Sequence, residues 1–159
     1  MRCRPSSPTY PGPTSSGRRA RSASANFAIV VVDASAVVDL LLDRIPADWV
    51  AERIRAARRV RAPHLIDVEV ASALRRGVAA GDVSAFRAER SLDLFLGLPL
   101  RRYRTTPFLH RMWSLRSTLS IHDAAYVALA EALDEPLVTT DAPLSRSHGH
   151  RARVEVFPG

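Results

Sequence analysis

The sequence predicts an α/β fold, in which a central parallel sheet of about five strands is covered by helices on both faces. Two observations lead to this prediction. Short apolar segments alternate along residues 27–159 with longer segments in which apolar residues recur at helical spacing. The first short segment is apolar at every position, as expected for a strand that is buried on both faces.

The first predicted strand covers residues 28–32 and ends immediately before Asp33. A short apolar helix is expected at residues 35–42 with Ser35 as its N-cap, because serine readily accepts a hydrogen bond from the first turn. Residues 48–57 combine apolar and charged positions in the pattern of an amphipathic helix. Residues 58–62 are predicted to form the second strand.

A long helix is predicted after Pro63. The evidence is a single apolar stripe at helical spacing, formed by Ile66, Val70, Ala73, Leu74, Gly77 and Val78. Gly81 is expected to end this helix, because glycine is common just after a helix C-terminus. Residues 84–96 are predicted to form a second helix that runs antiparallel to the first.

The rest of the chain predicts three more strands, at residues 100–104, 137–139 and 154–157. Helices are expected between the third and fourth of the five strands, at residues 108–115 and 123–133. Strands that alternate with helices in this way imply a parallel sheet with helices on both faces. Ligands of such sheets bind at the carboxyl ends of the strands.

The composition excludes several classes of enzyme. All 23 residues counted as Lys or Arg are arginines. Without lysine the chain cannot contain a P-loop, a Schiff-base or pyridoxal site, or the acidic cluster with lysine of a response-regulator receiver. The single cysteine, Cys3, excludes an intramolecular disulfide, a four-cysteine zinc site and a CxxC redox motif. The reducing cytoplasm is therefore the expected compartment.

Residues 1–26 differ from the rest of the chain and are expected to form a disordered tail. They contain five arginines, four prolines and six serines but no acidic residue, and such a composition cannot supply a core. A transit peptide, an arm that contacts RNA and an inert extension all remain open interpretations. Residues 27–159 are expected to form one domain, and no apolar run in the chain is long enough to span a membrane.

Four acidic residues are the candidate functional residues. Asp33 and Asp141 each follow a predicted strand, so both are expected at the carboxyl edge of the sheet. Glu69 lies beside the apolar stripe of the long helix, and Asp123 opens a later helix. Taken singly, each has an ordinary explanation, such as helix capping or exposure to water. Taken together, gathered carboxylates repel one another and require protons or a cation, and oxygen ligands favour Mg²⁺ or Mn²⁺ over Zn²⁺.

Four motifs resemble those of a known family in both order and spacing. They are Val31-Val32-Asp33-Ala34-Ser35, residues 63–74 with the sequence PHLIDVEVASAL, residues 119–130 with the sequence LSIHDAAYVALA, and Val138-Thr139-Thr140-Asp141. In these motifs the chain resembles the PIN-domain ribonucleases, and among them the VapC-type toxins of bacterial toxin–antitoxin pairs. The resemblance extends from around Ile29 to the C-terminus. It implies a PIN-like three-layer α/β/α nuclease domain over residues 27–159.

The resemblance also implies an activity and a set of site residues. The activity is Mg²⁺-dependent hydrolysis of RNA phosphodiester bonds, with Mn²⁺ as a possible substitute, leaving 5′-phosphate and 3′-hydroxyl ends. The expected catalytic and metal-binding residues are Asp33, Glu69, Asp123 and Asp141. The Ser35 hydroxyl is expected near them as a substrate-binding group. Arg116, seven residues before Asp123, is a further candidate for a contact with a substrate phosphate or with the acids.

The chain departs from the family at Ser72, where Asn is frequent, and at His122, where Tyr is frequent. Neither departure removes a carboxylate, so both bear on the choice of substrate. The expected partners are the RNA substrate, a cognate antitoxin protein and a second copy of the chain in a homodimer, with no membrane. We expect the C-terminal segment of the antitoxin to place a basic side chain near Asp33 and Asp123, because a carboxylate cluster without a metal attracts arginine.

Two other functions are compatible with parts of the sequence. A catalytically silent RNA-binding or RNA-processing module could use the same fold and the arginines of the tail. A phosphatase of the haloacid dehalogenase type also places an Asp after its first strand, but it needs a second Asp where this chain has Ser35, and a lysine.

Histidine and aromatic residues outside the four motifs are weaker candidates. His148 and His150 lack a third ligand nearby in sequence and are expected in a polar loop. Three aromatic residues can stack on RNA bases, although core or dimer contacts are their more common role. These residues are Trp49, Phe108 and Trp113.

Overall fold

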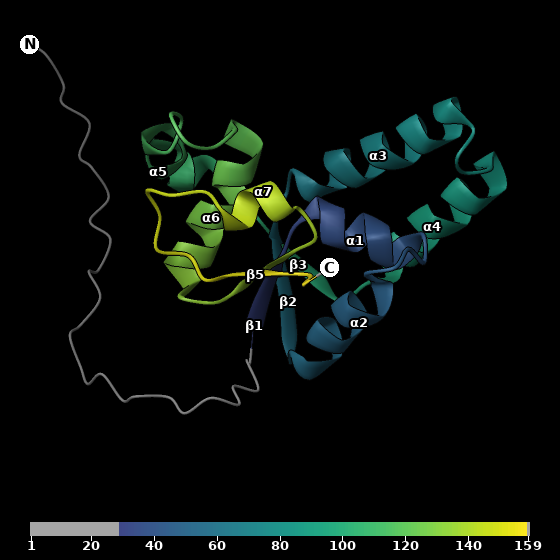
Figure 1. Cartoon of the computed structure of the whole chain (residues 1–159), viewed down its shortest axis with the longest axis horizontal. Coiled ribbons are helices and arrows are strands. Elements are labelled where there is room, and N and C mark those ends of the chain that lie inside the picture. Colours follow the sequence, from purple (N-terminus) through teal and green to yellow (C-terminus); the bar gives the residue numbers. More distant parts are fainter. Residues whose placement is uncertain (1–28, 159) are drawn as a thin grey trace, which may run out of the picture.

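The protein, as a computed structural model, is built around a five-stranded sheet (Figure 1), and the structure describes residues 29–158. The strand order is β3-β2-β1-β4-β5, and every neighbouring pair of strands is parallel. The strands are β1 (Ile29–Val32), β2 (Arg59–Pro63), β3 (Leu100–Tyr103), β4 (Leu137–Thr139) and β5 (Val154–Val156). The predicted α/β class with a parallel sheet of five strands is confirmed.

Helices connect the strands and cover both faces of the sheet. They are α1 (Ala34–Leu41), α2 (Ala47–Ala56), α3 (Ile66–Ala80), α4 (Ala85–Gly97), α5 (Leu109–Ser114), α6 (Ile121–Leu133) and α7 (Ala142–Ser145), with a 3₁₀ turn η1 (Thr106–Phe108) before α5. Figure 1 shows α1 to α4 on one side of the sheet and α5 and α6 on the other. The predicted three-layer α/β/α arrangement is therefore confirmed.

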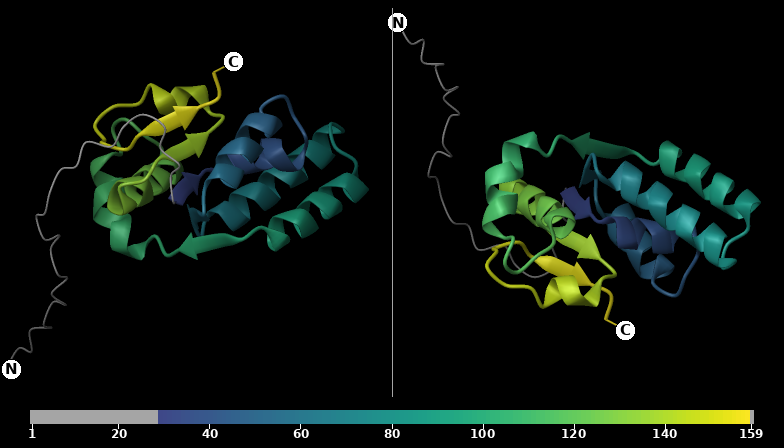
Figure 2. Two further views of the ribbon diagram at one scale, coloured as in Figure 1. Left: turned by 90° about the horizontal axis from the view of Figure 1, so that it is seen from below. Right: turned by 90° about the horizontal axis from the view of Figure 1, so that it is seen from above.

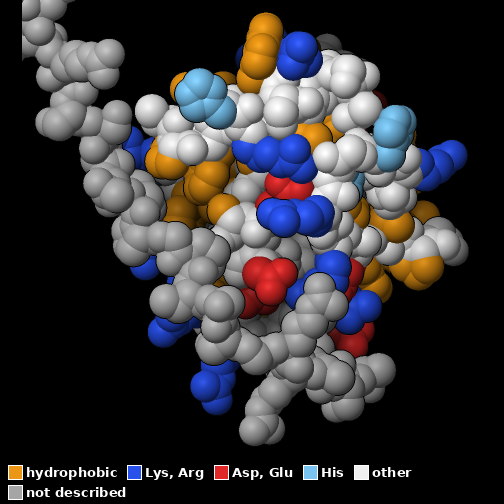
Figure 3. All heavy atoms as spheres, turned by 90° about the vertical axis from the view of Figure 1, so that its left-hand side faces the viewer, with side chains coloured by type: hydrophobic (Ala, Val, Ile, Leu, Met, Phe, Trp, Pro, Cys, Tyr) orange, Lys and Arg blue, Asp and Glu red, His pale blue; other side chains and the backbone are white. Residues whose placement is uncertain are grey.

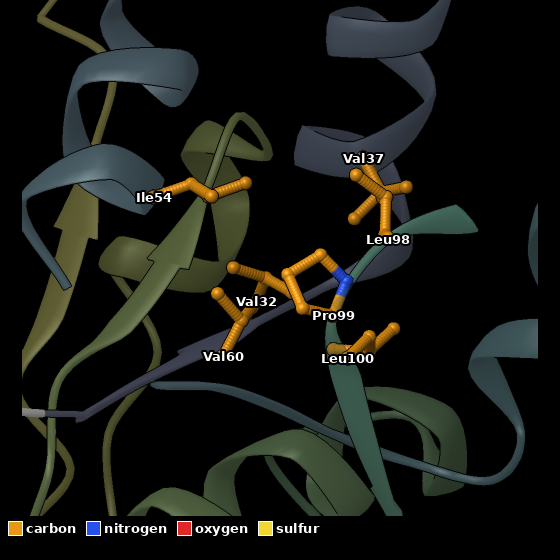
Figure 4. Close-up of a pocket in the computed structure, with 7 residues that line it drawn as sticks. All are labelled: Val32, Val37, Ile54, Val60, Leu98, Pro99 and Leu100. Atoms are coloured by element: carbon orange, nitrogen blue, oxygen red, sulfur yellow. The ribbon is translucent and has the colours of Figure 1, made fainter. Parts of the chain in front are cut away.

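Successive side chains of β2 and β3 point to opposite faces of the sheet. Val60 on β2 and Leu100 on β3 are paired in the sheet and point toward α1 and α2, where they line an apolar pocket (Figure 4). The next pair, Arg61 and Arg101, points to the opposite face, because successive side chains of a strand alternate. That opposite face is covered by α6, which contacts β1, β2 and β4.

The core combines the two faces of the sheet with one fully buried helix. Seven consecutive residues of α6, residues 124–130, are buried, as expected of a helix that is apolar on every side. The pocket under α1 and α2 is lined only by apolar side chains: Val32, Val37, Ile54, Val60, Leu98, Pro99 and Leu100. Because it offers no polar group, this pocket has no means of orienting a substrate.

Helices α3 and α4 form an antiparallel pair that extends beyond the sheet, as both views of Figure 2 show. The predicted apolar stripe of α3 contributes Ile66, Val70 and Leu74 to the core. Gly81 ends α3 in the left-handed conformation, with φ of 82°, which glycine adopts without steric cost. The predicted helix pair is therefore confirmed.

Several predicted boundaries differ from the structure for identifiable local reasons. The N-cap of α1 is Asp33, not Ser35, because the Asp33 carboxylate accepts the hydrogen bond from the Ala36 amide. Helix α6 begins at Ile121, since Ser120 rather than Asp123 is at its start and acts as N-cap. The helix predicted at residues 108–115 is divided into η1 and α5. The short helix α7 was not predicted, because four residues show no periodicity.

A half-buried ion pair between Arg111 and Glu131 fixes the loop that precedes β5. Both guanidinium nitrogens of Arg111 that face Glu131 donate to its carboxylate, at 2.7 and 2.8 Å. The same arginine donates to the carbonyl of Gly149 at 3.0 Å, and Glu131 accepts from the backbone of Arg151. Because α5, α6 and the loop share these bonds, the chain returns to the sheet edge in a fixed position.

The predicted tail, residues 1–26, lies outside the described residues. Within residues 29–158, none of the helices has both the length and the apolar character needed to cross a membrane.

Candidate active site

Asp33 lies at the point where β1 ends and α1 begins. Its Oδ1 accepts hydrogen bonds from the Ala36 amide at 2.9 Å and from the Ser35 hydroxyl at 2.7 Å. The residue is only 6% exposed. Burial raises the pKa of Asp33 to about 6, because the hydrogen bonds it accepts only partly offset the loss of hydration and Asp141 adds repulsion. Asp33 is therefore both a helix cap and a buried acid that is costly to ionise.

Thr139, the last residue of β4, links Asp33 to Asp141. Its hydroxyl donates to Oδ2 of Asp33 at 2.6 Å and accepts a hydrogen bond from the Asp141 amide at 2.9 Å. The pairing of Val32 with Val138 sets this contact, since it brings the ends of β1 and β4 side by side. The two acids therefore occupy fixed positions where the strand order changes direction, which is the usual ligand site of such sheets.

Asp141 itself is half-buried and makes no capping hydrogen bond to α7. The capping explanation therefore does not apply to this residue. Burial raises the pKa of Asp141, and repulsion from Asp123 raises it further. Among residues 29–158 its carboxylate accepts no hydrogen bond, so the group is available to a ligand.

Asp123 lies in the first turn of α6 and shares a reciprocal cap with Ser120. The Ser120 hydroxyl accepts a hydrogen bond from the Asp123 amide at 3.1 Å and donates to Asp123 Oδ2 at 2.7 Å. The Ser120 hydroxyl therefore caps the helix and binds the Asp123 carboxylate, whereas in a capping box the carboxylate would accept from the backbone amide of the N-cap residue. The cap orients the carboxylate at the same edge of the sheet as Asp141.

Glu69 reaches the site from the first turn of α3. Its Oε2 accepts a hydrogen bond from the hydroxyl group of Tyr126 at 2.5 Å. Burial raises the pKa of Glu69, and repulsion from Asp123 raises it further. The hydrogen bond from Tyr126 and the positive charges of His122 and Arg76 lower this pKa, but they only partly offset the rise. Burial and Glu69 together raise the pKa of Tyr126, so its hydroxyl keeps its proton and remains the donor.

The four predicted acids are therefore neighbours. The charge of Asp141 raises the pKa of Asp33, and the charge of Asp123 raises the pKa of both Glu69 and Asp141. Their carboxylates do not converge, however: within residues 29–158, no three His, Cys, Asp or Glu side chains are grouped closely enough to hold a metal ion. Hydroxyl groups bind Asp33, Glu69 and Asp123 instead.

The donor chemistry of the site fits a hard divalent cation. Every candidate ligand is a carboxylate oxygen, which is the donor type that Mg²⁺ and Mn²⁺ prefer. Three of the four acids have a raised pKa, and repulsion from another of the four contributes in each case. A bound cation would reverse this repulsion.

The structure places Arg116 differently from the four acids. Its guanidinium donates to the carbonyl of Trp113 at 2.9 Å and stacks over the Trp113 ring at 5.0 Å. Trp113 is 63% exposed, so this aromatic residue is not part of the core. A phosphate contact by Arg116 stays a prediction. Trp49, in contrast, packs edge-on against Phe157. His150 contacts the Ser147 hydroxyl in the loop before β5.

The sequence predicted the Ser35 hydroxyl near the acids, where it donates to Asp33, but sequence reasoning missed the other hydroxyl groups that bind them. Tyr126 carries a hydroxyl group in a fully buried stretch of α6, and buried hydroxyl groups almost always have a hydrogen-bond partner. A search for that partner could have indicated Glu69. Thr139 and Thr140 immediately precede Asp141, so they were candidates for the same edge. A fifth acid, Asp39, was also missed: it accepts from the Thr140 hydroxyl at 2.7 Å and pairs with Arg44 at 3.1 Å.

Comparison with known proteins identifies the family of the chain. The model of the family described as the PIN domain matches residues 30–147. The Ribonuclease VapC12 of Mycobacterium tuberculosis is 44% identical over 128 residues, which are 80% of this chain and 98% of that protein. The Ribonuclease VapC9 of the same organism is 40% identical over 130 residues, which are 82% of this chain and 99% of that protein.

Two solved structures have a similar fold. PAE2754 from Pyrobaculum aerophilum has a TM-score of 0.59 and 25% identity, covering 80% of this chain and 83% of that one. The structure of VapBC2 from Rickettsia felis, bound to a DNA fragment from their promoter, also has a TM-score of 0.59. It covers 80% of this chain and 98% of the other, at 13% identity, so this likeness concerns the fold alone.

The chain belongs to the PIN-domain family. Within that family it is of the VapC type.

Proposed function

We propose that this protein is an endoribonuclease toxin that hydrolyses RNA phosphodiester bonds with a divalent cation, Mg²⁺ or Mn²⁺. The observation that carries the proposal is the set of four mutually repelling carboxylates at one edge of the sheet. Relatives more than 40% identical are named ribonucleases, and these carboxylates supply the ligands that such a reaction needs.

Asp33, Glu69, Asp123 and Asp141 are the residues that would hold the cation. The chemistry supplied by the cation, when bound, is a lowered pKa of water, orientation of the scissile phosphate and compensation of charge on the departing 3′ oxygen. The neighbouring hydroxyl groups fix the carboxylates in advance. Ser35 and the Ala36 amide donate to Oδ1 of Asp33 and Thr139 donates to Oδ2, so Oδ2 keeps one lone pair for a cation. Tyr126 fixes Glu69 in the same way.

The test of this function is cleavage of single-stranded RNA by the purified full-length chain. We expect cleavage in Mg²⁺ or Mn²⁺, complete loss on chelation with EDTA, and recovery when Mg²⁺ is restored, with 5′-phosphate and 3′-hydroxyl ends on the products. Cleavage that persists in EDTA, or that leaves a 2′,3′-cyclic phosphate, would refute the metal-dependent mechanism. RNA binding without cleavage under any metal condition would favour a catalytically silent module.

We also propose an antitoxin and a second copy of the chain as protein partners in the cytoplasm. Exposed apolar side chains on the projecting α3–α4 pair support a protein contact there, because such side chains favour burial: Val68, Phe86, Leu94 and Leu96 are each more than half exposed. Sedimentation at micromolar concentration tests the dimer, and a monomer would contradict it. The four acids are complementary to an arginine of the antitoxin.

We expect a peptide of the antitoxin's C-terminal segment to inhibit cleavage and to bind at least about tenfold more weakly when its arginines are replaced by methionine, because a charge-assisted hydrogen bond is lost. Isothermal titration calorimetry measures this difference. Equal affinity of the two peptides would show that the acids are not the antitoxin's target.

A further inference from the structure

Arg61 is a buried charge in the middle of the sheet. It lies on β2 between Val31 of β1 and Arg101 of β3, and it is only 8% exposed. Val60 points to the α1 and α2 side, so Arg61 points to the α6 side. Burial of a guanidinium at such a position is rare unless the charge has a partner.

Its contacts within the protein do not neutralise this charge. The Arg61 guanidinium lies over the ring of Tyr103 at 5.8 Å, and the Arg101 guanidinium lies over the same ring at 5.4 Å. Two cations therefore share one aromatic ring. Among the described residues, the buried Nε of Arg61 has no hydrogen-bond partner. Arginine does not lose its proton in proteins, so deprotonation cannot relieve the cost.

Two other arginines of this protein, by comparison, are paired with acidic side chains. Arg102, one residue along β3 from Arg101 and on the opposite face, donates through Nε to Asp67 at 2.6 Å. Arg111 donates to the Glu131 carboxylate through two nitrogens. Both have an acidic partner within the chain, whereas Arg61 forms no ion pair with any of residues 29–158. The difference points to an anion from outside the protein.

The position of Arg61 relates it to the acid site. Asp33 is two residues beyond Val31, the partner of Arg61 on the neighbouring strand. Strand spacing and rise place the two Cα atoms about 8 Å apart on the same face of the sheet. The Arg61 side chain leans toward Tyr103 on β3, away from β1, so it does not pair with Asp33. On the face of the molecule that carries α5 and α6, arginine side chains lie next to acidic side chains (Figure 3).

We propose that Arg61 and Arg101, which both contact the Tyr103 ring, form a subsite for a phosphodiester group of single-stranded RNA next to the cleavage site. This inference rests on the proposed function for the identity of the polyanion. A strand whose scissile phosphate lies at the acids has further phosphates on either side of it. The phosphate oxygens would accept hydrogen bonds from the terminal guanidinium nitrogens of Arg61, which, unlike Nε, are not among the buried unpartnered atoms and make no hydrogen bond within residues 29–158. Tyr103 fixes the spacing of the two cations.

The experiment compares RNA binding by Arg61→Met with binding by the wild-type chain. Methionine keeps the length of the side chain and removes the charge. Arg55→Met is the matched control, because Arg55 is an exposed arginine of α2, on the other side of the sheet. A fluorescein-labelled single-stranded oligoribonucleotide is titrated in EDTA, which prevents metal-dependent cleavage, and anisotropy is recorded over a series of salt concentrations.

For Arg61→Met we expect a Kd at least about fivefold higher and a salt slope lower by about 0.7, the value for one phosphate contact on a single strand. We expect Arg55→Met to change neither quantity appreciably. The melting temperature of Arg61→Met should be unchanged or higher, because an unpaired buried charge is replaced by an apolar side chain. A purely structural arginine would give the reverse pattern, a lower melting temperature with unchanged RNA affinity of the folded protein.

Two further measurements keep the inference testable if Arg61→Met does not fold. Arg101→Met changes an exposed residue and should weaken RNA binding in the same way. In the wild-type chain, the Nε–Hε resonance of Arg61 should shift when the oligoribonucleotide is added. An unchanged resonance at saturating RNA, or equal affinities and salt slopes for Arg61→Met, Arg101→Met and wild type, would overturn the inference.

Cleavage is measured separately in Mg²⁺, so the two proposals fail independently. If the wild type cleaves RNA and Arg61→Met binds and cleaves RNA normally, the subsite is refuted and the function stands. If the wild type cleaves nothing but Arg61→Met still loses RNA affinity, the subsite is supported and the function is refuted. Normal RNA binding with loss of antitoxin binding would assign Arg61 to a protein carboxylate and refute the subsite.

Discussion

The substitution Asp123→Asn is expected to abolish RNA cleavage while leaving the fold intact. The charge of Asp123 repels the carboxylates of both Glu69 and Asp141 and raises their pKa values. A cation bound at the site would therefore interact strongly with this charge. The amide keeps the size of the side chain and can still accept the Ser120 hydrogen bond, but it removes the charge that attracts a cation. We expect cleavage in Mg²⁺ to fall more than about 100-fold, beyond the 10- to 100-fold effects typical of residues that only support metal ligands.

The melting temperature distinguishes this effect from misfolding. Removing Asp123 relieves repulsion on two neighbouring carboxylates, so the metal-free Asp123→Asn protein should melt at the same temperature as wild type or higher. Asp134→Asn is a matched control, because Asp134 ends the same helix at its opposite end and is exposed. A folded Asp123→Asn protein that cleaves RNA at the wild-type rate in Mg²⁺ would end the metal-site proposal.

The sheet and its helices were predictable because their physical signals are local. The valines before Asp33 and the apolar stripe of α3 specify a buried strand and a core-facing helix without information from the rest of the chain. The same holds for the positions of Asp33 and Asp141, since a residue that follows a parallel strand lies at the carboxyl edge of the sheet wherever that strand is placed.

What the sequence could not predict depends on contacts between distant segments. The bond between Tyr126 and Glu69 joins residues 57 positions apart, and no local pattern specifies that pairing. The sequence places Arg61 in a predicted strand but does not show that its side chain is buried. A strand pattern cannot tell which charged side chain lies under a helix and which faces water. Helix caps were misplaced for a related reason: Asp33 and Ser35 are both good caps, and only the geometry of the turn selects Asp33.

The stability of the metal-free protein is expected to fall as the pH rises from about 4 to 7, through ionisation of Asp33. The pKa of this carboxyl is raised from 3.8 to about 6 in the folded state, mainly by burial. The folded protein therefore holds the Asp33 proton more tightly than the unfolded chain. Its contribution is fully present below pH 3.8 and is lost as the pH rises through 6. At 1.36 kcal/mol for each pKa unit, the loss at neutral pH is roughly 3 kcal/mol.

Asp33→Asn isolates this contribution, because the amide resembles the protonated carboxyl and does not titrate. Chemical denaturation in EDTA should give similar free energies of unfolding for wild type and Asp33→Asn near pH 4, and a variant that is more stable by up to roughly 3 kcal/mol at pH 7. Mg²⁺ should stabilise only the wild type at pH 7, since binding favours the ionised carboxylate. Cleavage by the wild type should fall about tenfold for each pH unit below 6, as protons displace the cation. A pH profile of stability that is the same in both proteins would show that Asp33 ionises as freely in the folded protein as in water.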